Sequence, residues 1–123
     1  MLKLAIPVLH VRDSVAAEAF YCHGLGFARA FAYRLDEANP NPCYLGLRRD
    51  EAWQHVSSFA GDGVSGAAVY LLVDNVDALH EEFVGRGVAI ALAPTDQTWG
   101  NREMYVCDPD GNAIRFTWYQ QGD

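Results

Sequence analysis

Side chains that could hold a small molecule occur in three short segments of the chain, two of which carry them at every second position. Side chains two residues apart in a β-strand point to the same face of the sheet, so each segment is predicted to present its set together. The set comprises His55 and Ser57 in one segment, Tyr70 in a second, and Arg115 and Thr117 in a third. An arginine can bind a carboxylate or another acceptor on a ligand. A salt bridge to an acidic neighbour is an equally good interpretation of Arg115.

Trp99 lies in the polar stretch Gln97–Glu103, with no hydrophobic periodicity around it. A tryptophan in a loop has no core position to fill, so it can stack on planar or cationic groups of a ligand. Packing as a lid over its own core is the alternative of equal weight. Arg102, in the same stretch, is also a ligand-binding candidate. So is Tyr33, for which core packing is the default interpretation.

The familiar arrangements of catalytic residues are missing from the sequence. It contains no Ser-His-Asp order, no Gly-rich phosphate loop, no CxxC and no paired-carboxylate motif. The two aspartates of Asp108–Asn112, DPDGN, are explained by turn chemistry. We therefore assign no catalytic residue from the residue pattern.

Composition narrows the class of partner. The 123 residues carry 9 Lys and Arg against 16 Asp and Glu, a formal net charge of −7. Such a surface repels nucleic acid and anionic membranes and attracts cationic small molecules, although net charge does not say where the acids gather. We expect no signal peptide and no membrane span. Three widely spaced cysteines favour a reducing compartment, and hence the cytoplasm.

The elements that must position these residues occur twice. In the first half we predict a strand at 4–11, which Pro7 makes an edge strand or an exchanged arm. A helix should follow to about His23, with Val15, Ala16, Ala19 and Phe20 on its buried face. Further strands are predicted at 27–35, 43–48 and 53–59, with a loop at 36–42 and a link between the halves at 60–66.

The second half repeats this pattern at an offset of about 61 residues. We predict a strand at 67–73, a helix at 75–85 that buries Val76, Leu79 and Phe83, a strand at 88–93, and a hairpin of 104–107 and 113–118. The expected fold is therefore α+β, with two βαβββ repeats in one domain, about 1–60 and 67–123 of 1–123. The repeats should form a curved mixed sheet with helices outside, and its concave face would be the ligand site.

Four motifs in this order resemble the vicinal-oxygen-chelate superfamily, which includes glyoxalases, extradiol dioxygenases and bleomycin-resistance proteins. They are VRD at 11–13, FY at 20–21, LGF at 25–27 and DPDGN at 108–112. The stretches AIPVLHVRD, QTWGNRE and DPDGNAIRF are most similar to the bleomycin-resistance branch. That resemblance implies a homodimer that exchanges its N-terminal strand at a proline matching Pro7. It also implies sequestration of a cationic glycopeptide antibiotic, chemically unaltered, at the subunit interface.

The resemblance also bears on metal binding, because metal-dependent members carry His or Glu ligands at three recognisable positions. Here Ile6, Ala68 and Arg115 occupy those positions. Aliphatic side chains cannot ligate a metal, and arginine has no lone pair to offer. We therefore expect a metal-free protein without a cofactor, although His10, His55 and Glu103 could rebuild a shifted site.

Three functions remain open at this point. The first is a metal-free binding protein that sequesters a bulky cationic or aromatic ligand at the dimer crevice. The alternative is a metal-dependent lyase, isomerase or dioxygenase with shifted ligands. The third is a metal-free enzyme that uses Arg115 or His10 in acid–base work. We favour binding over catalysis.

Overall fold

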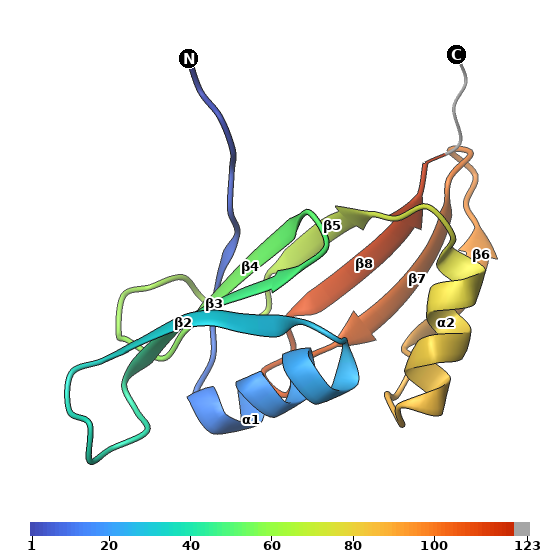
Figure 1. Ribbon diagram of the computed structural model, residues 1–123. Coiled ribbons are helices and arrows are strands. Elements are labelled where there is room, and N and C mark those ends of the chain that lie inside the picture. The colour runs from blue at the N-terminus through green and yellow to red at the C-terminus, as the bar shows by residue number, and fades with distance from the viewer. Residues whose placement is uncertain (120–123) are drawn as a thin grey trace.

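The computed structural model describes residues 1–119, and its elements follow one order twice (Figure 1). The first repeat contains β1 (Val8–His10), α1 (Ser14–Glu18), its π-helical continuation η1 (Ala19–Gly24), β2 (Ala28–Arg34), β3 (Cys43–Arg49) and β4 (Ala52–Ser57). The second contains β5 (Ala68–Leu72), α2 (Val76–Gly85), β6 (Leu92–Asp96), β7 (Arg102–Cys107) and β8 (Ala113–Trp118). The predicted α+β fold with two βαβββ repeats is confirmed. No helix among these has the length and apolar character needed to cross a bilayer.

Each repeat builds its own four-stranded mixed sheet. The strand orders are β1-β4-β3-β2 and β5-β8-β7-β6, with β1 parallel to β4, β5 parallel to β8 and the other neighbours antiparallel. Strand β1 lies at a sheet edge, as expected for a strand beginning at Pro7, which has no N–H to donate. The carbonyl of Pro7 accepts the backbone N–H of His55 at 3.0 Å. Pairing with β4 begins only at Val8, so the strand predicted from Leu4 is shorter than expected.

Each sheet packs one face against its own helix and leaves the other face without a helix. Helix α1 contacts β3 and β4, whereas α2 contacts β6, β7 and β8. We call the uncovered sides the first and second open faces. The register places Phe31, Tyr33, Tyr44, Trp53, His55 and Ser57 on the first open face. It places Tyr70, Leu72, Glu103, Tyr105, Arg115 and Thr117 on the second.

The helix of the first repeat buries a different stripe from the one predicted. Its buried positions are Ser14, Ala17 and Tyr21, whereas Val15 is exposed. Two contacts account for the shift. Asp13 caps the helix by accepting the N–H of Val15, and the Tyr21 hydroxyl, carried by the π-helical turn, donates to the Asp108 carboxylate at 2.9 Å. Helix α2 buries Val76 and Phe83 as predicted.

The strand predicted at 88–93 is displaced and runs from Leu92 to Asp96. The backbone N–H of Val88 bonds to the carbonyl of Phe83, so this residue still belongs to the end of the helix. Val88 and Ile90 pack against the core without joining the sheet ladder. The apolar character of Val88 and Ile90 therefore reflects packing against the core and not membership of a strand. The strand itself begins at Leu92 and is an edge strand that tolerates Pro94.

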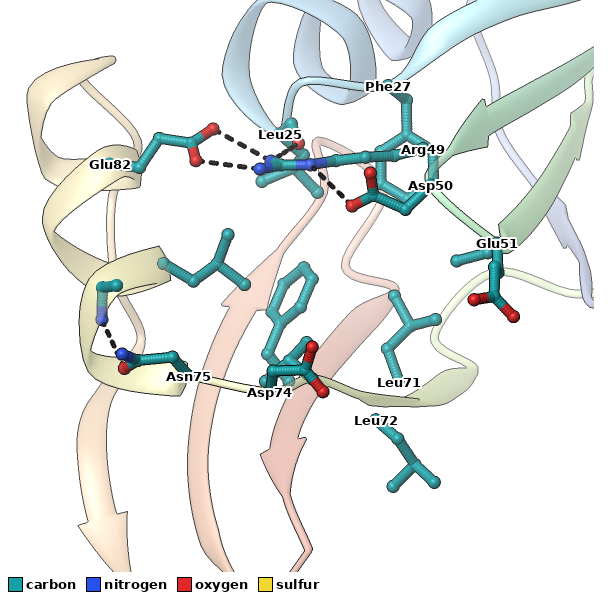
Figure 2. Close-up of a pocket in the computed structure, with 15 residues that line it drawn as sticks. Leu25, Phe27, Arg49, Asp50, Glu51, Leu71, Leu72, Asp74, Asn75 and Glu82 are labelled. Carbon is teal, nitrogen blue, oxygen red and sulfur yellow. Dashed lines mark hydrogen bonds and ion pairs between the residues drawn. The ribbon is translucent and has the colours of Figure 1, made fainter.

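An ion pair joins the two repeats on the helix side. The two terminal nitrogens of Arg49, at the end of β3, donate to the two carboxylate oxygens of Glu82 on α2 at 2.9 and 2.8 Å (Figure 2). The same guanidinium donates to the carbonyl of Leu25 at 2.8 Å. These hydrogen bonds with Arg49 lower the pKa of Glu82.

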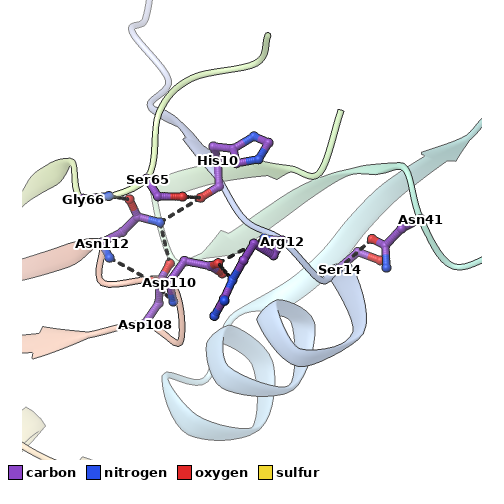
Figure 3. Close-up of polar contacts among 9 residues, drawn as sticks. All are labelled: His10, Arg12, Ser14, Asn41, Ser65, Gly66, Asp108, Asp110 and Asn112. Atoms are coloured by element: carbon purple, nitrogen blue, oxygen red, sulfur yellow. Dashed lines mark hydrogen bonds and ion pairs between the residues drawn. The ribbon is translucent and has the colours of Figure 1, made fainter. Parts of the chain in front are cut away.

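A buried amide makes a second connection at the start of β5 (Figure 3). The side-chain oxygen of Asn112 accepts the backbone N–H groups of Gly66 and Ala67 at 2.9 and 3.1 Å. Its nitrogen donates to the carbonyl of His10 at 3.0 Å and to Asp108 at 2.9 Å. One side chain from the DPDGN turn therefore ties together β1, the link between the repeats, and β8.

Candidate functional site

The second open face carries a carboxylate surrounded by aromatic donors. Glu103 is only 1% exposed, yet it faces the side of β7 that no helix covers. Its carboxylate accepts the hydroxyl of Tyr70, the indole N–H of Trp99 at 3.1 Å and the hydroxyl of Tyr105 at 2.7 Å. Three side chains from β5, β7 and the preceding loop are thus oriented by one acid.

The charge on this face is set by those hydrogen bonds. Burial raises the pKa of Glu103, but the bonds from Tyr70, Tyr105 and Trp99 and the nearby positive charge of Arg115 outweigh it, so the net shift is downward. Glu103 is therefore ionised at neutral pH. Conversely, donating to this carboxylate raises the pKa of Tyr105, which stays protonated.

Arg115 lies in the middle of this face, directly opposite Tyr70 on one side and Tyr105 on the other. Its guanidinium carbon is 5.0 Å from the centre of the Tyr105 ring, a cation–π contact. Within residues 1–119 no acidic side chain forms a salt bridge with it. The structural salt bridge considered from the sequence is therefore not formed, and the guanidinium can meet an acceptor from outside the chain.

Trp99 stands at the edge of this face on the loop between β6 and β7. Gly100 supplies the left-handed conformation of that loop, with φ of 98°. The indole is 61% exposed even though its N–H is bound to Glu103. The ring is thus fixed at its edge while most of its surface remains open, which suits stacking on a planar group better than covering a core.

The first open face is an aromatic array centred on His55. The rings of Phe31, Tyr44 and Trp53 lie 5.4, 5.2 and 6.1 Å from the imidazole, all in edge-to-face geometry. The Tyr44 oxygen is 2.7 Å from Nδ1 of His55. Burial lowers the pKa of His55, so the imidazole is neutral at pH 7. Tyr33 extends the array at the margin, where it stacks on Phe59.

The structure separates the residues predicted from the sequence into three groups. Tyr33, His55, Tyr70, Trp99 and Arg115 lie on or beside the open faces with surface available to a ligand.

Ser57 and Thr117 have the predicted orientation but are fully buried. The Ser57 hydroxyl donates to Asp62 at 2.8 Å, whereas the Thr117 hydroxyl has no hydrogen-bond partner among residues 1–119.

Arg102 lies on the opposite side of β7, toward α2, where it pairs with Asp77 at 2.9 Å and Asp96 at 3.1 Å. The structure therefore does not bring Arg102 to either open face.

Sequence reasoning missed several residues of these faces, among them Phe31, Tyr44 and Tyr105. It considered Glu103 only as a possible metal ligand, because the strand was predicted to begin at Met104. The ladder begins at Arg102, and this gives Glu103 and Tyr105 the same orientation. Extending the predicted strand one residue toward the N-terminus would have found Glu103, whereas Tyr105 already lay inside that strand and was overlooked.

The residues present do not fit a metal centre. Across the described part of the chain, no three His, Cys, Asp or Glu side chains come close enough to share an ion. Ala68 and Arg115, at two of the family's ligand positions, lie on the second open face. Nδ1 of His10 is 3.3 Å from the carbonyl oxygen of Asp62.

A family model described as glyoxalase superfamily protein matches residues 1–123. The chain belongs to the glyoxalase superfamily. It is 29% identical over 126 residues to a bleomycin resistance protein of Geobacillus stearothermophilus, a match that covers 91% of this chain and 93% of that protein. The resemblance found in the sequence motifs is thereby confirmed.

Solved structures of other proteins share the fold. A bleomycin resistance determinant encoded on the transposon Tn5 superposes with a TM-score of 0.77 at 24% identity, covering 98% of this chain and all of that one (100%). A bleomycin-binding protein complexed with bleomycin superposes with a TM-score of 0.76 at 24% identity, covering 97% and 100%. These likenesses establish the arrangement of the two repeats.

Proposed function

We propose that this glyoxalase-superfamily protein is a metal-free binding protein that sequesters a bulky, aromatic and cationic small molecule without altering it. The observation that carries the proposal is the second open face, where Glu103 holds Tyr70, Trp99 and Tyr105 around the guanidinium of Arg115, which has no salt-bridge partner among residues 1–119. These groups supply ring faces for stacking and few candidates for a nucleophile or a base.

The ligand charge follows from two features. Ring faces of tryptophan and tyrosine attract cations, and the chain as a whole carries −7. Arg115 would take an acceptor group elsewhere on the same ligand, such as a carbonyl or a carboxylate. The bleomycin-binding relative has bleomycin in its crystal structure, so a cationic glycopeptide of that kind is the first ligand to test.

We further propose that the complete site forms between two copies of the chain. Tyr33 on the first open face is 58% exposed, and Tyr70 and Leu72 on the second are 48% and 63% exposed. Faces this apolar are commonly covered by a partner. A homodimer would place the aromatic array of one copy against the Glu103 face of the other and create two identical crevices. Exchange of the exposed segment before Pro7 would strengthen the contact.

Titration with metal-free bleomycin, followed by calorimetry and tryptophan fluorescence, tests the function. We expect saturable binding, a raised Tm and recovery of the ligand with unchanged mass. Trp99→Ala should weaken binding at least tenfold. The control is Trp118→Phe, which changes an exposed tryptophan on the helix side, away from the open faces, and should leave binding unchanged. Absence of a Tm shift with bleomycin would refute the proposal.

Light scattering tests the assembly. We expect a particle of twice the 13.6 kDa chain mass. Leu72→Glu, which places a charge on the second open face outside the Glu103 cluster, should yield monomers that bind the ligand poorly. If the wild-type protein is a monomer and still binds bleomycin, the site does not form between two copies, and the open face of a single chain is the site.

A further inference from the structure

A separate groove lies on the helix side of the molecule, between the two repeats (Figure 2). Its volume is about 550 Å³, within the range of small-molecule sites. The hairpin turn after β3 forms one wall, and β5 and α2 form the other. Its apolar floor comprises Leu25, Phe27, Leu71, Val73, Leu79 and Phe116. Apart from Leu72, no residue of either open face lines it.

The rim of this groove carries an excess of negative charge. Arg49 and Glu82 form an ion pair and offset each other. The remaining charged side chains of the lining, Asp50, Glu51 and Asp74, are all acidic. Asp50 comes no closer than 3.9 Å to Arg49. In the described part of the chain, Glu51 and Asp74 have no ion-pair partner (Figure 2).

This combination selects one class of occupant. A floor of leucine, valine and phenylalanine side chains favours an apolar body, because burying that surface releases water. Unpaired carboxylates on both walls attract a cation and repel an anion. We propose that the groove is a second binding site, specific for a compact amphiphilic organic cation whose charge lies between Glu51 and Asp74. This inference stands independently of the open-face site.

Two ions of the same shape and opposite charge provide the test, tetraphenylphosphonium and tetraphenylborate. Calorimetry with the full chain should show saturable binding of the phosphonium, one per chain, and binding of the borate at least tenfold weaker. The double variant Glu51→Gln/Asp74→Asn should weaken phosphonium binding about tenfold, roughly threefold for each lost carboxylate. Glu81→Gln, an exposed acid outside the groove, is the matched control and should leave it unchanged.

Further variants distinguish binding in the groove from binding at the open faces. Trp99→Ala should leave phosphonium binding intact, and the double variant should leave bleomycin binding intact. Equal affinity for the two ions, no effect of the double variant, or loss of phosphonium binding in Trp99→Ala would each overturn the proposal. A full chain that binds no phosphonium until residues 1–6 are deleted would also overturn it, since the N-terminal segment of a neighbouring copy would then fill the groove.

Discussion

Replacing Glu103 by glutamine removes one negative charge from an enclosed position while keeping the shape of the side chain. The carboxylate accepts three hydrogen bonds, from Tyr70, Trp99 and Tyr105. The glutamine oxygen can keep two of these donors, and its amide can donate to the third group, whose hydroxyl can rotate to accept. The fold should therefore survive, and the change isolates the contribution of the charge.

The magnitude follows from the hydrogen bonds. A bond to a charged group contributes about 1.5–3 kcal/mol and a neutral bond about 0.5–1.5 kcal/mol, so each exchange costs about 1 kcal/mol. Three such exchanges cost about 3 kcal/mol, partly offset because a neutral amide is easier to bury than a carboxylate. We expect a net loss of about 1–2 kcal/mol in the free energy of unfolding, or roughly 3–8 °C in Tm.

The pH dependence identifies the cause of the loss. Because the pKa of Glu103 is below its usual value of 4.5 in the folded chain, its stabilisation is complete above about pH 4.5. It disappears as the pH falls through the lower, folded-state pKa. In urea unfolding at fixed protein concentration, the free energy of unfolding should therefore be higher for wild type than for Glu103→Gln at neutral pH. The two free energies should converge as the pH is lowered.

Glu81→Gln serves as the control, since this exposed acid on α2 should change stability by no more than about 0.5 kcal/mol. If Glu103→Gln unfolds at the wild-type urea concentration at neutral pH, the carboxylate does not organise the face. If the two proteins differ by the same amount in acid, the loss comes from packing and the reasoning from charge is wrong.

Three further outcomes are expected. Arg49→Met should lower the free energy of unfolding by about 1 kcal/mol in urea titrations. Hydrogen bonds from Arg49 lower the pKa of Glu82, so the loss should fade as acid protonates Glu82. Gly46→Ala would place a methyl carbon in the space of the Phe31 ring, so this ring must move away from His55. Burial lowers the pKa of His55, so NMR titration should show that pKa rising toward 6.5 once the ring moves. Mass spectrometry of purified protein should find no stoichiometric divalent metal, and chelators should leave bleomycin binding unchanged.

Local patterns predicted the elements of this chain well. Alternation located β2, strand-like runs between turn signals located β3, β4, β5 and β8, and period 3.6 located α2 with Val76 and Phe83 buried. The Asp-Gly turn at 110–111 marked the last hairpin. These signals work because the side-chain geometry of a helix or strand is fixed by neighbours in the sequence.

The errors have one origin, which is contact between distant segments. The hydroxyl of Tyr21 bonds to Asp108, 87 residues away, and the buried stripe of the first helix follows that contact. Val88 and Ile90 are apolar because they pack on the core, although the ladder begins at Leu92. Glu103 was left outside its strand because register depends on the partner strand β8.

The candidate site divides in the same way. Sequence by itself determined the family, the two repeats and the shared orientation of Tyr70, Arg115 and Thr117, because motif order and strand alternation are properties of the chain. Only tertiary structure decided that Thr117 is buried and that Arg102 turns toward α2. It also located three acids, besides the Glu82 that pairs with Arg49, around the groove between the repeats. Net charge is a sum without positions, and burial depends on which distant segments cover a side chain.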